Sequence, residues 1–173
     1  DGTRAILLYL VTYLFMSLGA FVVVVAVENV GLAATIDGFR GLGRRAPRTA
    51  AAMAIFLFSL TGLPPLAGFF GKFYLFYALI ARGGTFMLTL ALIGILNSAL
   101  SLYFYARVLK AMYFEPTPKD DERPLPIARV HGGLLALLAL PTLALFLFWS
   151  PLQRLVDASM TQWAPVAPPI SRR

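Results

Sequence analysis

The sequence predicts an all-α, polytopic transmembrane helix bundle with one discontinuous, broken helix. Of its 173 residues, 59% are hydrophobic, and the mean hydropathy of +0.77 is too high for a soluble domain. Its apolar runs are long enough to cross a bilayer, whose hydrocarbon core is about 30 Å thick. One run is interrupted by the consecutive prolines Pro64 and Pro65, which predicts the break. We therefore expect the lipid bilayer to surround most of the chain.

The composition also limits the chemistry of the chain. There is no cysteine, which excludes disulfides, thiolate metal sites and cysteine-ligated iron–sulfur clusters. The single histidine provides too few ligands to favour a haem or zinc site. We expect no metal and no bound cofactor in this chain, so any redox chemistry belongs to another chain. The net charge of +7 is spread over the loops between apolar runs. This pattern is typical of membrane topology, and we expect no nucleic-acid partner.

The first predicted transmembrane span covers residues 1–28, with an apolar run from Ala5 to Val27. Glu28 ends this span and is either an interfacial charge or a proton carrier. A basic loop over residues 29–46 follows, which we expect in the cytoplasm. The chain enters the span at once, without an initiator methionine. We therefore expect it to be a piece of a longer protein, with the rest of the same subunit as a partner.

Residues 47–81 form the predicted broken transmembrane unit. As one straight helix, the 32 residues from Ala50 to Ala81 would reach about 48 Å at 1.5 Å per residue, which exceeds the ~30 Å core. The unit must therefore bend, break or tilt, and we expect two half-helices separated near Leu63–Leu66. The residues that break or loosen the helix are Gly62, Pro64, Pro65, Gly68 and Gly71. Such interruptions are tolerated where protein or a water-filled cavity surrounds them.

Lys72 is the only charged residue in this apolar run. A charge at mid-bilayer costs roughly 2.5–3.5 kcal/mol, so a lysine there indicates a functional site. The alternative, a lysine that extends from a helix end to the interface, fits poorly because long apolar segments flank it on both sides. Burial disfavours the charged form of an amine, which permits proton exchange. We expect Lys72 to serve proton translocation from the first turns of the second half-helix.

The third predicted span covers residues 82–113 and carries one small and polar stripe. Its members recur at three- and four-residue spacing, and they are Gly94, Asn97, Ser98, Ser101 and Tyr105. Two interpretations stay open: close helix packing by small residues, or a hydrated lining beside Lys72. In the second case Asn97, Ser98 and Ser101 should face the broken unit. Arg107 further along either reaches the cytoplasmic interface or points into a polar pocket.

The remaining segments are a cytoplasmic loop over residues 114–132, a fourth span over residues 133–152 and a C-terminal tail over residues 153–173. Nine lysines and arginines lie in the loops after spans one and three, against five on the opposite side. The positive-inside rule places the first set in the cytoplasm and the C-terminus outside. We expect residues 164–173 of this tail, which are rich in proline, to lie extended.

Three stretches resemble a known family. The most specific is the sequence SLTGLPPLAGFFGKFY over residues 59–74; the others are YLVTYLFMSLGAF over residues 9–21 and SLYFYARV over residues 101–108. They resemble the antiporter-like membrane subunits of respiratory complex I and their Mrp antiporter relatives, and within them the subunit N group of bacterial NADH–quinone oxidoreductases. The resemblance covers nearly the whole chain up to about Pro151.

The resemblance implies the C-terminal portion of an antiporter-like inverted-repeat fold in the bacterial inner membrane, with a periplasmic C-terminus. Lys72 matches the lysine of the outward half-channel in a proton-translocating subunit. The implied partners are other membrane subunits of complex I, and NAD, FMN, iron–sulfur clusters and quinone would be held by partner subunits. The alternatives are a subunit of a cation/proton antiporter, a membrane-bound hydrogenase relative, or a purely structural fragment in which Lys72 is sealed from water.

Overall fold

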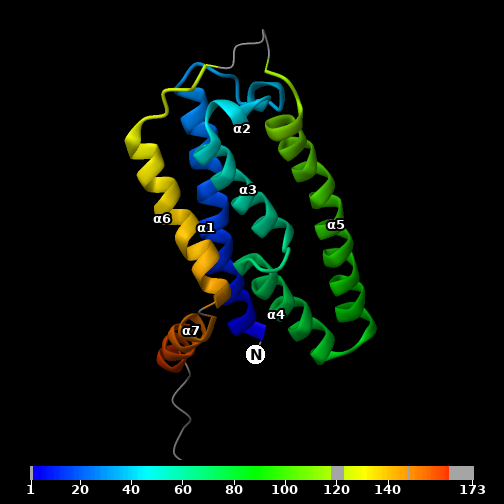
Figure 1. Cartoon of the computed structure of the whole chain (residues 1–173). Helices are drawn as coiled ribbons and strands as arrows, with labels where there is room; N and C mark the ends of the chain where they lie inside the picture. The colour runs from blue at the N-terminus through cyan, green and yellow to red at the C-terminus, as the bar shows by residue number, and fades with distance from the viewer. Residues whose placement is uncertain (1, 118–122, 148, 164–173) are drawn as a thin grey trace, which may run out of the picture.

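The chain folds as a helix bundle, as predicted. The computed structural model describes residues 2–117, 123–147 and 149–163, and every regular element in these ranges is helical. The elements are α1 (Gly2–Glu28), η1 (Asp37–Phe39), α2 (Leu42–Arg45), α3 (Pro47–Thr61), α4 (Ala67–Arg82), α5 (Thr85–Phe114), α6 (Arg129–Leu147) and α7 (Trp149–Trp163). Helix α1 runs between α6 on one side and α3 with α4 on the other, and α5 packs outside α3 and α4 (Figure 1).

Among the described residues, two helices are long and apolar enough to cross a membrane alone, namely α1 with 27 residues and α5 with 30. Helices α3 and α4 have 15 and 16 residues, or about 22–24 Å each, so neither reaches across a ~30 Å core by itself. They follow one another down the bundle in Figure 1 and form the discontinuous unit. The helix break predicted near Leu63–Leu66 is confirmed, because α3 ends at Thr61 and α4 begins at Ala67.

Local sequence explains both ends of α3. Pro47 occupies the first helical position, where its missing N–H costs nothing. At the other end Gly62 has φ +89°, and its N–H donates to the carbonyls of Phe58 and Ser59. This left-handed cap is the usual glycine stop signal. The two prolines follow directly, so the helix cannot resume before Ala67.

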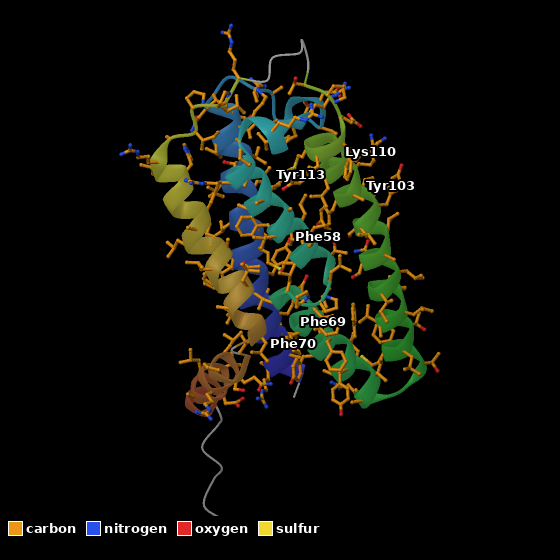
Figure 2. The ribbon with its side chains drawn as sticks, viewed as in Figure 1. Phe58, Phe69, Phe70, Tyr103, Lys110 and Tyr113 are labelled. Atoms are coloured by element: carbon orange, nitrogen blue, oxygen red, sulfur yellow. The ribbon has the colours of Figure 1, made fainter. Side chains whose placement is uncertain are left out.

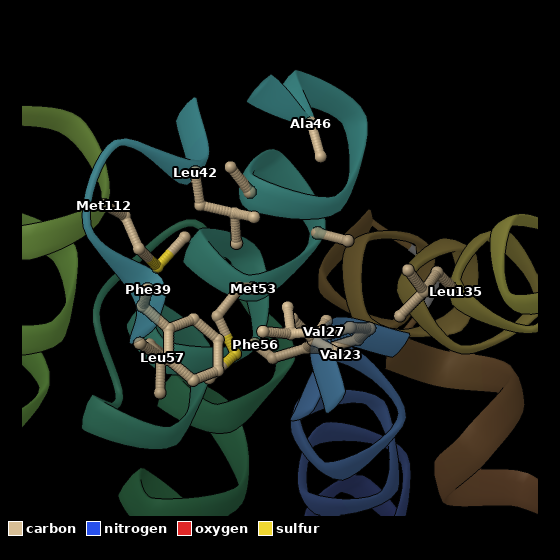
Figure 3. Packing of buried hydrophobic residues seen from close by; sticks show 12 residues of the cluster. Val23, Val27, Phe39, Leu42, Ala46, Met53, Phe56, Leu57, Met112 and Leu135 are labelled. Atoms are coloured by element: carbon tan, nitrogen blue, oxygen red, sulfur yellow. The ribbon is translucent and has the colours of Figure 1, made fainter. Parts of the chain in front are cut away.

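A hydrophobic core lies at the end of the bundle that carries the basic loops. Val23 and Val27 of α1 pack there with Phe56 of α3, and Met112 of α5 closes the cluster from the other side (Figure 3). Gly19 permits this packing, since a Cβ at that position would collide with the Phe56 ring. The larger of the two hydrophobic clusters among the described residues therefore lies toward the basic end of the bundle.

The loops after α1 and after α5 lie together, as the charge count required. Arg45 donates from Nε to the carbonyl of Arg123 at 3.3 Å, and the Leu125 N–H donates to the Arg45 carbonyl at 2.9 Å. Arg40 pairs with Glu115 at 3.2 Å. The two loops therefore share one basic end; its cytoplasmic orientation stays a prediction.

The segment after α6 begins with a helix. Residues Trp149–Trp163 form helix α7, whose direction departs from that of α6 by 95°. Leu152 and Val156 bury one face against Leu8 of α1. Pro151 lies in the first turn of α7, where proline is tolerated. Residues 164–173, where the extended tail is expected, lie outside the described residues.

Candidate functional site

The helix break places Lys72 in the second turn of α4, as predicted. Its side chain is half-buried and turns back toward the break. Nζ donates to the carbonyl of Thr61, the last residue of α3, at 3.1 Å, and to the hydroxyl of Ser98 on α5 at 3.0 Å. One amine thus joins both half-helices to the neighbouring span, and both acceptors are uncharged.

The backbone groups freed by the break find partners within the protein. Ser59 is fully buried, and its hydroxyl accepts from the Gly68 N–H at 3.1 Å while donating to the Met16 sulfur at 2.8 Å. The Thr61 carbonyl, released by the end of α3, accepts from Lys72. A buried unpaired backbone group would cost several kcal/mol in a bilayer, so these contacts make the break tolerable.

Gly68 and Gly71 lie inside α4 and are buried. A Cβ on Gly68 would collide with the Ser59 carbonyl, and one on Gly71 would lie 2.8 Å from the Thr12 hydroxyl. These glycines let α4 approach α3 and α1 closely, which brings Lys72 to the break.

Two cavities adjoin Lys72. The larger, about 320 Å³, has aromatic, amide and hydroxyl groups on its walls, contributed by α1, α4 and α5. Its polar lining is Tyr9, Tyr13, Lys72, Asn97, Ser98, Ser101 and Tyr105. The smaller, about 200 Å³, lies on the side of Phe69 and Phe73. No carboxylate is among the residues that line either cavity in the described part of the chain.

The stripe on α5 faces the broken unit. Ser98 touches Lys72, while Asn97, Ser101 and Tyr105 reach the larger cavity with it. Gly94 lies against Phe76 of α4, so the packing interpretation also holds for one member of the stripe. The other face of α5 carries Tyr103, which is 60% exposed, and points away from the bundle (Figure 2).

Arg107 and Glu28 are not brought to this site. Both side chains are exposed, and neither lines a cavity beside Lys72. Glu28 ends α1 at the basic end of the bundle, near the α1–α2 connection. The structure therefore separates these two charges from the lysine, and the polar pocket considered for Arg107 is absent from the two cavities described here.

The contribution of α1 to this site was not predicted from the sequence. Tyr9 and Tyr13 line the larger cavity, Thr12 contacts Gly71, and Met16 accepts from Ser59. These four residues recur at three- and four-residue spacing, which places them on one face of a helix. This periodicity was available in the sequence, but an aromatic stripe in an apolar span is more often a packing surface.

Comparison with known proteins agrees with this architecture. The family model described as "NADH:quinone oxidoreductase/Mrp antiporter, TM" matches residues 1–100. The chain belongs to this family.

Relatives within the NADH:quinone oxidoreductase/Mrp antiporter family carry the name subunit N. NADH-quinone oxidoreductase subunit N 2 of Sorangium cellulosum is 52% identical over 161 residues, covering 92% of this chain and 31% of that protein. Subunit N of Anaeromyxobacter sp. is 42% identical over 164 residues, covering 92% and 32%. The chain thus spans about a third of the length of these relatives. The expected resemblance is confirmed.

A solved structure supports the fold of this family member. A chain of respiratory complex I from Thermus thermophilus with bound Aureothin superposes with a TM-score of 0.70 at 29% sequence identity. The match covers 87% of this chain and 34% of that one. The helix bundle is therefore shared with that chain.

Proposed function

We propose that this chain is part of a proton-translocating membrane subunit of a bacterial NADH–quinone oxidoreductase, with Lys72 as the proton carrier of an outward half-channel. The observation that carries the proposal is the position of Lys72 Nζ, between uncharged oxygens at a helix break and beside a polar-lined cavity. The relatives named subunit N supply the enzyme context. Electron transfer, with its NAD, FMN, iron–sulfur clusters and quinone, belongs to partner subunits.

The neutral surroundings of Lys72 suit reversible proton exchange. A carboxylate partner would hold the amine in its charged form, whereas the Thr61 carbonyl and Ser98 hydroxyl hold it by hydrogen bonds that water can replace. The larger cavity has hydroxyl and amide groups on its walls that would order such water. Proton release would leave the amine able to accept from the same hydroxyl.

The energetic demand on one carrier is moderate. A protonmotive force of ~200 mV corresponds to about 4.6 kcal/mol per proton, at about 2.3 kcal/mol per 100 mV. If Lys72 took this whole load, its proton affinity would have to change by about three powers of ten at ~1.4 kcal/mol each. Loss or gain of two hydrogen bonds to a charged group, at about 1.5–3 kcal/mol each, covers this range.

The test is replacement of Lys72 with alanine in the assembled complex, with proton uptake per NADH oxidised measured in sealed vesicles. Uptake should fall because the carrier is lost, while the complex still assembles. Lys110→Ala is the matched control, since this lysine projects from α5 with a 70% exposed side chain (Figure 2). Unchanged proton uptake in the Lys72 variant would contradict the proposal.

A second candidate function is a subunit of a cation/proton antiporter or of a membrane-bound hydrogenase relative. The observation that favours the antiporter is the family description itself, which includes Mrp antiporters. The same lysine site would serve either assembly. Identification of the subunits that co-purify with the full-length protein distinguishes them, because only the oxidoreductase brings an NADH-oxidising arm.

The chain would occupy the bacterial inner membrane with its basic end in the cytoplasm. The motivating observation is the clustering of Arg40, Arg45 and Arg123 at one end of the bundle. The remaining part of the subunit and other membrane subunits would cover its exposed apolar faces.

A further inference from the structure

A groove distant from Lys72 opens between α3 and α6 at the basic end of the bundle. Its volume is about 680 Å³, within the range of about 300–1,000 Å³ that is common for ligand pockets. Helices α3 and α6 stand on either side of α1 there (Figure 1). The site described above uses none of its residues.

The walls of the groove are apolar and built from small side chains. On α3 the groove follows Ala51, Ala52 and Ile55, and on α6 it follows Gly132 and Ala136. Small residues on facing helices ordinarily permit close contact between them. Here a space stays open beside the contact between α3 and α6, and Leu135, which belongs to the buried core cluster, forms part of its wall.

The mouth of the groove is positively charged. Arg48 lies in the first turn of α3, Arg129 begins α6, and both side chains are exposed. No acidic residue is among the described residues that line the groove. A ligand that fits this arrangement carries an anionic group at one end and an apolar chain behind it.

The groove also has the length expected for one leaflet of a bilayer. From Arg129 to Ala139 α6 advances about 15 Å at 1.5 Å per residue, which is half of the ~30 Å hydrocarbon core. Basic pockets between transmembrane helices on the cytoplasmic side are known binding sites for anionic lipid headgroups. A segment of protein would supply the apolar contacts, but it would also need one acidic residue beside Arg48 and another beside Arg129.

We infer that this groove binds a phospholipid with an anionic headgroup, such as phosphatidylglycerol. Arg48 and Arg129 hold the phosphate, and an acyl chain lies along Ala51, Ala52 and Ala136. The lipid would fill the space between α3 and α6 and so support α3, the half-helix that ends at the Lys72 site.

The test uses the assembled complex in nanodiscs of phosphatidylcholine that contain a photoreactive phosphatidylglycerol with the reactive group in its acyl chain. Labelled peptides are mapped by mass spectrometry. In the unaltered complex, peptides from residues 47–61 and 129–147 should be labelled. In the Arg48→Gln/Arg129→Gln variant, half-maximal labelling should require about thirty-fold more probe, at about 1 kcal/mol per arginine near the surface.

Two further variants separate charge from space. Arg82→Gln/Arg154→Gln removes two exposed arginines outside the groove and should label normally. Ala51→Phe/Ala136→Phe fills the groove from two exposed positions, keeps both arginines and should also lose labelling. Excess inorganic phosphate should not compete, because it lacks the acyl chain.

Equal labelling of the unaltered complex and the Arg48→Gln/Arg129→Gln variant would overturn the inference. Equal labelling by a photoreactive phosphatidylcholine would also overturn it, since that probe carries no net charge. A structure of the full-length subunit in which another part of the same protein fills the groove would do the same. None of these outcomes bears on proton uptake through Lys72, so the two proposals can fail separately.

Discussion

Lys72 depends on a single hydroxyl for its link to the neighbouring helix. Ser98 supplies it from α5, whereas the second acceptor is the Thr61 backbone, which no substitution of Thr61 removes. Ser98 can therefore be replaced while Lys72 stays in place. Such a variant tests the hydrogen bond to the amine separately from the amine itself.

We expect Ser98→Ala to slow proton pumping roughly tenfold, because a hydrogen bond to a charged group contributes about 1.5 kcal/mol or more. The measurement is the initial rate of proton uptake at saturating NADH. Thr89→Ala is the control, since that exposed hydroxyl on the same helix donates to the Thr85 carbonyl.

Replacement of both Ser98 and Ser101 with leucine should slow pumping further, because the leucine side chains would fill the larger cavity. Normal pumping in this double variant would refute a hydrated path through that cavity.

Gly68 should tolerate no side chain. In Gly68→Ala the new methyl group would meet the Ser59 carbonyl, and overpacking of this kind costs about 1–3 kcal/mol. We expect a lower melting temperature of the full-length subunit. Gly133→Ala is the matched control, because its Cβ would meet nothing within 4 Å in a helical position, where alanine is preferred. Equal melting temperatures would show that α4 can move away from α3 without cost.

Some residues of the site could be predicted from the sequence, whereas others are recognised only from their contacts in the structure. A lone charge in an apolar run and two adjacent prolines are anomalies that predict Lys72 and the helix break. Tyr9 and Met16 are ordinary residues for a membrane span, so only their contacts across α1 and α4 reveal a role. The close packing at Gly68 could not be predicted from the sequence, since helix flexibility and close packing both favour glycine.

At the scale of elements, α7 is held by apolar, ionic and hydrogen-bonding contacts. Leu152 and Val156 pack against Leu8, Arg4 pairs with Asp157 at 2.9 Å, and Gln153 Nε2 donates to the Tyr74 hydroxyl at 3.0 Å. Both charged side chains are partly exposed, and such surface ion pairs contribute about 0–1 kcal/mol. We therefore expect the apolar contact to contribute most to the docking of α7.

We expect Leu152→Glu to release α7 from α1, because a charge would replace a buried side chain. Hydrogen exchange over residues 149–158 should become faster in the full-length protein. Leu155→Glu is the control on the same helix, with a side chain that is 69% exposed. Slow exchange in both variants would mean that contacts outside the described residues hold α7.

Helix ends were predictable wherever the sequence contains a strong stop or start. Pro47, Gly62 and the proline pair determine the ends of α3, and the structure follows them. Helix α7 was missed because its apolar residues are few and Pro151 stands near its start. An amphipathic helix of this length gains most of its stability from tertiary contacts. Those contacts cannot be deduced from the sequence of the helix alone.

For the molecule as a whole, orientation in the membrane is the main open prediction. The absence of cysteine allows single cysteines to be introduced as reporters. We expect Thr85→Cys, at the α4–α5 turn, to react with a membrane-impermeant maleimide in intact cells. Pro116→Cys, at the basic end, should react only in inverted vesicles. The reverse pattern would place the basic end outside and contradict the charge count.

The fold class and the basic end follow from properties averaged over many residues, which explains why they were predictable. Hydropathy, run length and arginine distribution each involve tens of positions, so single exceptions do not change the result. The relation between α5 and the broken unit was predicted only from a stripe of polar residues. Whether that stripe packs tightly or borders a cavity depends on interhelical distances of a few ångströms. The spacing of residues along the sequence gives no information on those distances.

Helix α5 is packed tightly near its C-terminal end and loosely around Ser98. Near its C-terminal end Ala111 and Met112 are fully buried, and the Ala111 carbonyl accepts from the Gly41 N–H, whereas around Ser98 two cavities adjoin it. Ser98 lies about 20 Å from that pivot at 1.5 Å per residue, so a tilt of ~5° displaces it by about 2 Å. Such a displacement breaks the 3.0 Å contact with Lys72 while leaving the anchored end in place. A small tilt of α5 about its basic end would thus be enough to separate Ser98 from Lys72.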